Sequence, residues 1–383
     1  MKGISLYVHV PFCAARCPYC DFATAPAASA LRGRFIEALA ADVAREGAAL
    51  GHPRVRTAYF GGGTPSLLEP GEIGRIGEAI QRAFKWRPRE VTFEANPATL
   101  DRARLAAWRA LGATRISIGA QSLSERGLRA LGRTHRVTDV APAVSAARSL
   151  GLDVSLDLIF GWPGQSAEEW RGDLDAAIAL APDHLSCYPL ELSLEPDASL
   201  VDWPGGWPAL ERWRRAAVSG QPDDRGIAVL YAIAERRLAR AGFRHYEIAN
   251  WARAGKRSLH NAVYWRNGEW LGVGPGAHSH LGGRRSHRPV GLAAYAGAIA
   301  AGLPRAVDTG GDHAAEDAML RLRLDTGVDV ARSAARWGAA AGRIAAALRS
   351  LDGRGLVRWT GDRARLTPRG RMLANEVFVR LLP

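Results

Sequence analysis

The chain has 383 residues, 47% hydrophobic and 23% charged, a composition that excludes wholesale disorder and predicts one large domain plus a smaller one. It carries 51 basic and 38 acidic residues, a net charge of +13, and its only lysines are Lys2, Lys85 and Lys256. The arginines are scattered along expected helices rather than massed in one run. Charge alone therefore does not indicate nucleic acid, and we expect no nucleic-acid partner.

Neither a membrane span nor an export signal is expected. The longest apolar run, residues 291–303, is shorter than the roughly 20 residues that cross a bilayer and is diluted by Ala and Gly. In the opening MKGISLYVHVPFC, apolar residues alternate with other residues. The segment lacks the continuous apolar core and the cleavage site of a signal peptide. We therefore expect a cytoplasmic protein.

Short β-type runs alternate with amphipathic helical stretches over the first 190 residues. The expected strands are 6–10, 58–60, 91–94, 116–119, 154–160 and 185–190. The expected helices between them are 31–50, 72–84, 101–111, 138–150 and 167–180. Six such repeats predict a parallel sheet with helices outside.

Most of these strands have one apolar and one polar face, unlike strands that are packed on both faces. The polar faces carry Tyr7 and His9; Thr92 and Glu94; Ser117, Gly119 and Gln121; Ser155 and Asp157; Ser186 and Tyr188. Burying such groups without partners costs about 1–3 kcal/mol each. We therefore predict an α/β fold over residues 1–240, an open (β/α)6 partial TIM-type barrel whose lumen holds a large polar ligand.

The composition changes after the sixth strand. Residues 196–225 hold three tryptophans with several Gly and Pro, which indicates a loop-rich insertion, and a helix at 229–241 follows. We expect residues 241–312 to be a connecting segment. Residues 313–383 are expected to form a small winged-helix-like α+β domain, with helices at 314–323, 328–337 and 343–352, then a hairpin and a last helix. No basic recognition helix is visible, so we do not assign this domain to DNA.

Three cysteines lie within eight residues, directly after the first strand. Cys13, Cys17 and Cys20 form a CxxxCxxC loop. A structural zinc ion needs four ligands, and no fourth cysteine follows, because position 22 is Phe22. Three thiolates suit a [4Fe–4S] cluster whose fourth iron stays open to a small molecule. Cys187 is interpreted as an ordinary buried strand residue.

This loop, placed at the end of the first strand of a βα barrel, resembles that of the radical S-adenosylmethionine (SAM) superfamily. The resemblance implies that Cys13, Cys17 and Cys20 hold the cluster, that SAM binds the open iron and that Tyr19 packs near it. It also implies that the segment 61–65 (GGGTP) receives the amino group of the methionine moiety. The further positions implied to contact SAM are Tyr7, Gly62, Gly63, Thr64, Glu94, Gln121, Arg133 and Asp157.

The motifs LYVHVPFCAARCPYCDF, YFGGGTPSLL, FEANP, GAQSL, GRTH and DLIFGWPGQ resemble the oxygen-independent coproporphyrinogen III dehydrogenase group, over essentially the whole chain. Decarboxylating members of that group carry a further cysteine where this chain has Phe22. Residues 260–265 (HNAVYW) match an HNxxYW segment typical of the sister branch, the radical SAM haem chaperones. The resemblance therefore implies a chaperone that binds haem and transfers it to an acceptor protein.

His260 is the candidate haem ligand, with Tyr264 and Trp265 either packing on the macrocycle or serving as core aromatics. Rival ligands are His9, His278 and His280. The sequence does not identify the acceptor, for which a respiratory-chain or membrane-associated protein is one alternative. It also leaves open the oligomeric state and whether SAM is cleaved. Two other functions are weighed: oxidative decarboxylation of coproporphyrinogen III, which Phe22 and HNxxYW disfavour, and a non-catalytic zinc or redox sensor, which lacks a fourth ligand.

Overall fold

The computed structural model describes residues 3–194, 202–203 and 206–382, which form two compact units. The barrel unit comprises residues 1–241 and 269–308, and the C-terminal unit comprises residues 242–268 and 309–383. The segment 241–312, expected to be a single connection, is thus divided: its first part belongs to the C-terminal unit and most of the remainder to the barrel unit.

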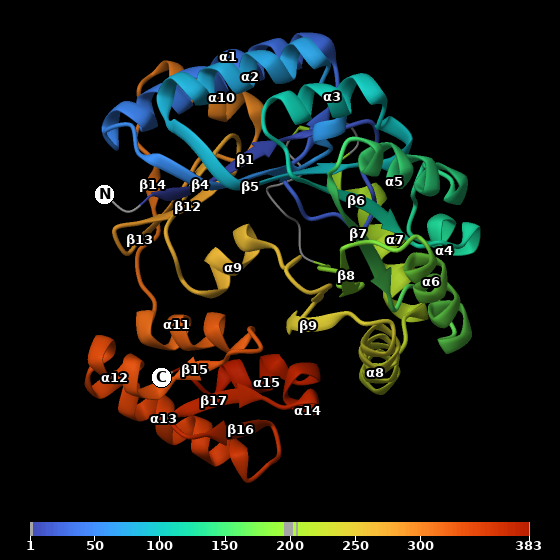
Figure 1. Cartoon of the computed structure of the whole chain (residues 1–383), viewed down its shortest axis with the longest axis vertical. Coiled ribbons are helices and arrows are strands. Elements are labelled where there is room, and N and C mark those ends of the chain that lie inside the picture. Colours follow the sequence, from blue (N-terminus) through green and yellow to red (C-terminus); the bar gives the residue numbers. More distant parts are fainter. Residues whose placement is uncertain (1–2, 195–201, 204–205, 383) are drawn as a thin grey trace. The chain divides into compact units, whose positions relative to one another are not determined.

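Six parallel strands form the centre of the barrel unit, each hydrogen-bonded to the next (Figure 1). In sheet order they are β1 (Ile4–Val10), β4 (Arg54–Gly62), β5 (Lys85–Ala95), β6 (Arg115–Gln121), β7 (Asp153–Phe160) and β8 (His184–Pro189). The helices between them are α1 (Ser29–Ala49), α2 (Pro70–Ala83), α3 (Arg102–Ala110), α4 (Glu125–Ala130), α5 (Val140–Ser149) and α6 (Ala167–Ala179). This order confirms the predicted α/β architecture.

The sheet continues beyond β1. Strand β11 (Trp270–Val273) pairs parallel to β1, and β12 (His278–Leu281), β13 (Arg284–His287) and β14 (Ala306–Val307) follow as antiparallel neighbours. Helix α10 (Leu292–Ala300) lies between β13 and β14 in the chain and packs on α1. The edge of the sheet therefore comes from the segment that the sequence indicated only as a connection.

The two faces of the strands differ as their sequence pattern predicts. Apolar side chains fill the face under the helices, where Phe60 and Phe93 pack on Trp108 of α3 with ring centroids 4.9 and 4.7 Å apart. Part of the polar face is satisfied internally, since the Ser155 hydroxyl lies 2.7 Å from His184 Nδ1. These two polar side chains of the lumen face are therefore paired with each other.

Two further helices follow β8 in the barrel unit, α7 (Gly206–Gly220) and α8 (Asp224–Arg240). Helix α7 occupies much of the stretch expected to be a loop-rich insertion, so that expectation was wrong for residues 206–220; residues 195–201 and 204–205 lie outside the described residues. No helix in the described part of the chain is both long and apolar enough to span a membrane.

The C-terminal unit is a separate α+β domain. Its elements are β9 (Arg244–Glu247), β10 (Asn250–Ala252), α9 (Leu259–Trp265), α11 (His313–Leu322), β15 (Val328–Asp329), α12 (Val330–Trp337), α13 (Ala339–Asp352), β16 (Val357–Thr360), β17 (Arg363–Leu366), α14 (Pro368–Met372) and α15 (Ala374–Val379). The last three strands form a sheet in the order β15-β17-β16. The helix expected at 328–337 begins two residues later, because Val328 and Asp329 pair with β17.

Candidate cofactor site

The three neighbouring cysteines lie in a loop that is clamped at both ends. Strand β2 (Phe12–Cys13) pairs with β3 (Ala25–Pro26), which closes the loop directly after β1. All three cysteines are half-buried and none is in a disulfide. Three free thiols held in one short, closed loop are what a cluster bound by three thiolates requires.

The glycine-rich segment after β4 docks against this loop through its backbone. Gly63 N donates to Val10 O at 2.8 Å and Thr64 N to Phe12 O at 2.7 Å. Gly62 has a φ of 104°, and a Cβ at that position would lie 2.3 Å from the His9 ring. Because only glycine fits there, a backbone amide can come close to whatever the loop binds.

Two arginines that sequence reasoning did not select hold the loop in shape. Arg214 on α7 is almost fully buried, and it donates to Pro18 O (2.9 Å), Cys20 O (3.2 Å) and the Asp21 carboxylate (2.6 Å). Arg16 also donates to Cys20 O, at 2.8 Å. Arg16 lies inside the motif, whereas no local signal distinguishes Arg214 from the other arginines of its helix.

Arg133 brings a positive charge to the cysteines. Its Nη1 lies 3.1 Å from Cys17 Sγ, and its Nη2 donates to Gly119 O at 3.3 Å. Burial raises the pKa of Cys13 to about 11 and that of Cys20 to about 12, so these thiols are protonated at neutral pH. A cationic iron–sulfur cluster would reverse that preference, because its ligands are thiolates.

Two half-buried carboxyl groups, Glu94 on β5 and Asp157 on β7, lie on the polar faces of strands that β6 separates. Glu94 accepts from the Tyr59 hydroxyl (2.8 Å) and from Gly62 N (3.1 Å), and burial raises its pKa to about 7. Asp157 accepts from the Ser117 hydroxyl at 2.9 Å, and burial raises its pKa too. Each carboxyl keeps lone pairs that could accept hydrogen bonds from a polar ligand.

Tyr7 and His9 form a fixed pair at the end of β1. His9 Nε2 lies 2.7 Å from Ala23 O, a group that only accepts, so this nitrogen carries the proton. His9 Nδ1 therefore accepts from the Tyr7 hydroxyl, at 3.0 Å. Burial lowers the pKa of His9 to about 4, so the ring is neutral. With both nitrogens engaged, His9 orients Tyr7 and the cysteine loop and has no nitrogen available to haem.

Gln121 and Tyr19 complete the set of residues selected from the sequence. Gln121 ends β6 with a φ of 63°, a left-handed conformation that is uncommon for a residue other than glycine and concentrates at functional sites. Tyr19, between Cys17 and Cys20, is half-buried, and burial raises the pKa of its hydroxyl. The barrel unit therefore contains every residue selected for the cluster and SAM.

His260 belongs to the C-terminal unit, in α9. Its ring is fully buried, its Nε2 lies 2.8 Å from the Tyr264 hydroxyl, and burial lowers its pKa to about 3. Trp265 packs under the Arg323 guanidinium, which lies 4.3 Å from the ring centroid. In this arrangement Tyr264 and Trp265 are half-buried, and no nitrogen of the fully buried His260 is exposed to a ligand.

Comparisons with known proteins identify relatives of this chain. Residues 7–177 match the model of the radical SAM superfamily, and residues 309–373 match the HemN C-terminal domain. The protein called heme chaperone HemW in Mycobacterium tuberculosis is 38% identical, over 100% of this chain and 95% of its own. The chain belongs to the heme chaperone HemW family of radical SAM proteins. The family member in Bacillus subtilis is 32% identical, over 98% of both chains.

A solved structure has the same fold. The Escherichia coli protein described as coproporphyrinogen III oxidase (HemN), a radical SAM enzyme, superposes with a TM-score of 0.84 over 99% of this chain and 90% of its own. The two sequences are 20% identical. The likeness therefore confirms the fold of the family, and the choice between the activities of its branches rests on other observations.

Proposed function

We propose that this chain is a radical SAM haem chaperone that binds haem and passes it to an acceptor protein. The observation that carries the proposal is the 38% identity, over the whole chain, with a protein named heme chaperone HemW. Phe22 supports it, because the decarboxylating branch has a cysteine at that position. In this proposal Cys13, Cys17 and Cys20 hold a [4Fe–4S] cluster with one open iron. A cluster of this type supplies one-electron chemistry when it is bound.

The lumen residues divide the recognition of SAM among them. Arg133 pairs with the methionine carboxylate, since a guanidinium binds carboxylates at two points. Glu94 and Asp157 accept from the hydroxyl and ammonium hydrogens of the cofactor. The backbone at Gly62 and Gly63 carries no side chains and so leaves room for the methionine moiety. Tyr7, Tyr19, Thr64 and Gln121 line the same site.

The raised pKa of Glu94 predicts that SAM binding depends on pH. Protonation of this carboxyl removes an ionised acceptor, and its pKa is about 7, so the affinity should fall as the pH drops through 7. One-proton linkage gives binding about tenfold weaker at pH 6 than at pH 8. Calorimetric titration of SAM into reconstituted protein measures this change. In Glu94→Gln the same pH change should have little effect, and an unaltered tenfold dependence in that variant would exclude Glu94 as the acceptor.

Haem ligation by His260 requires a local rearrangement. To bind haem, His260 Nε2 would give up its hydrogen bond with the Tyr264 hydroxyl and coordinate the haem iron instead. Tyr264→Phe removes that hydroxyl while keeping the ring, so it should strengthen haem binding. His260→Ala should abolish the ligand's spectral signature. Equal haem spectra and affinities in the wild type and in both variants would exclude His260 as the ligand.

A paired assay tests the function as a whole. Anaerobically reconstituted protein is titrated with haem while the Soret band is followed, and the same sample is given coproporphyrinogen III, SAM and a reductant. We expect a stoichiometric Soret shift and no protoporphyrinogen. Protoporphyrinogen formation would establish the decarboxylating activity instead, and the absence of a Soret shift would overturn the chaperone proposal.

A further inference from the structure

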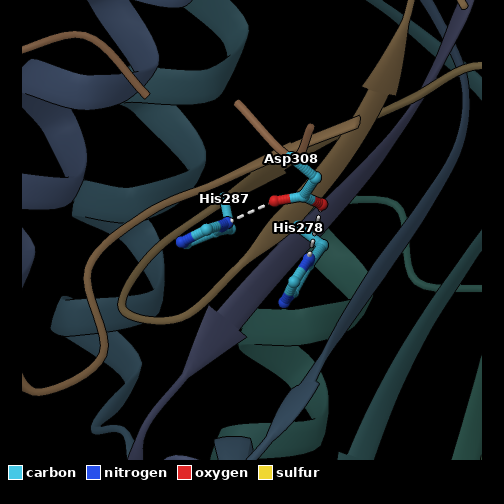
Figure 2. Close-up of side chains that lie close together, drawn as sticks. All are labelled: His278, His287 and Asp308. Carbon is cyan, nitrogen blue, oxygen red and sulfur yellow. Dashed lines mark hydrogen bonds and ion pairs between the residues drawn. The ribbon is translucent and has the colours of Figure 1, made fainter. Parts of the chain in front are cut away.

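Three potential metal ligands converge at the edge of the sheet of the barrel unit, on strands that the cofactor site does not use. In the β12–β13 hairpin, His278 pairs directly with His287, so both side chains lie on one face. Ala306 of β14 pairs with His287, and Asp308, two residues further on, returns to that same face. In Figure 2, dashed lines join both imidazole rings to the Asp308 carboxylate.

The donor atoms are already close enough for one ion. His287 Nδ1 lies 2.8 Å from Asp308 Oδ1, and His278 Nδ1 lies 4.0 Å from Asp308 Oδ2. One donor atom of each residue lies within 4.8 Å of the other two. Ligand atoms of a tetrahedral zinc ion, about 2.0–2.2 Å from the metal, are about 3.3–3.5 Å apart. Small side-chain rotations would therefore bring all three into bonding distance.

The donors are accessible and their chemistry is favourable. The side chains are 66% (His278), 37% (His287) and 38% (Asp308) exposed, and each is fixed on or beside a paired strand. Imidazole nitrogens and carboxylate oxygens are both donor types that bind zinc. The Arg285 guanidinium, over the Trp270 ring at 5.3 Å, opposes a cation here, and the Asp308 carboxylate offsets it. Within residues 3–194, 202–203 and 206–382 no other three such side chains come this close.

We propose that His278, His287 and Asp308 bind a divalent transition-metal ion, for which zinc is the best match. Two imidazole nitrogens and one carboxylate oxygen suit zinc, whereas Mg²⁺ and Ca²⁺ prefer oxygen ligands alone. Three protein ligands leave a fourth position for water or for a donor group of another molecule. This site is separate from the cysteine loop and does not depend on the proposed function.

Zinc titration of the reconstituted protein tests the proposal. Calorimetry should find one zinc site per chain, weakened by about tenfold or more in His287→Ala and in Asp308→Asn. His313→Ala is the matched control, because His313 is an exposed histidine 4.0 Å from Glu316, and it should leave zinc binding unchanged. Equal zinc affinity in the wild type and His287→Ala would overturn the proposal. The substituted side chains are exposed (Asp308) or half-buried (His287), and thermal unfolding of each variant verifies that it folds.

X-ray absorption at the zinc edge distinguishes this site from the cysteine loop. Binding by His278, His287 and Asp308 should give only nitrogen and oxygen neighbours at about 2.0–2.2 Å. A sulfur shell at about 2.3 Å would mean that zinc occupies the cysteine loop, and would overturn the proposal. Adding zinc at this site should leave the visible absorbance of the iron–sulfur cluster unchanged.

Discussion

Replacing Cys17 with Ser should abolish the iron–sulfur cluster. The loop offers three thiols, and no other cysteine lies within the segment 13–26 that β2 and β3 close. With one thiolate lost, two corners of the cluster would have no protein ligand, and a neutral hydroxyl does not replace a thiolate on iron. We expect bound iron to fall from about four atoms per chain to nearly none, with loss of the broad visible absorbance. Iron analysis and anaerobic absorbance spectra measure both.

Cys187→Ala provides the control for this result. Cys187 is fully buried in β8, where burial raises its thiol pKa, and it is far in sequence from the loop. This variant should keep the full iron content and spectrum. A Cys17→Ser protein that retained a wild-type cluster would contradict the assignment of three thiolates. Zinc found in place of iron in anaerobically purified wild type would contradict it as well.

Replacing Arg214 with Ala should make the cluster labile without removing any of its ligands. The guanidinium, 1% exposed, donates to the carbonyls of Pro18, Cys20 and Ser193, two of which belong to the cysteine loop. Alanine would remove the Arg214 donor from the Pro18 carbonyl and leave Cys20 O with the Arg16 donor, and a buried acceptor that loses its donor costs about 1–3 kcal/mol. Asp21 adds little to this loss, because its side chain is 45% exposed and can be hydrated. We expect stability to fall by about 1–3 kcal/mol and iron to be lost much faster.

The measurements are the rate of iron transfer to a chelator and the free energy of unfolding. Arg215→Ala is a matched control on the next residue of α7, since Arg215 is exposed and pairs with Glu211 one turn earlier. That variant should stay within about 0.5 kcal/mol of wild type and keep its iron as long. Arg214→Lys should recover only part of the stability. Lysine keeps the positive charge, but its ammonium group cannot reach all of the acceptors that the planar guanidinium reaches. If Arg214→Ala released iron at the wild-type rate, Arg214 would have no role in holding the loop.

The alternation of residue types predicted the barrel because it reflects a physical constraint that acts locally. Side chains two residues apart on a strand lie on the same face. A strand that is packed on one face and polar on the other therefore shows alternating apolar and polar residues in its sequence. Val8 and Tyr7 on β1 are an example: the first is buried under the helices and the second points toward His9. The prediction was weaker after β8, where tryptophan, glycine and proline suggested loops but residues 206–220 form α7.

Sequence alone determined the cysteine loop, the glycine segment and the family, since each depends on residues that are neighbours along the chain. Only the tertiary structure decided which distant groups meet. Arg214 reaches the loop from almost 200 residues away, and His278, His287 and Asp308 come together through strand register. The burial of His260 is also a result of the tertiary structure, because the HNxxYW motif by itself is compatible both with a haem ligand and with a buried core residue. Local patterns record what each element must bury, whereas a site assembled from several elements depends on packing that no single segment encodes.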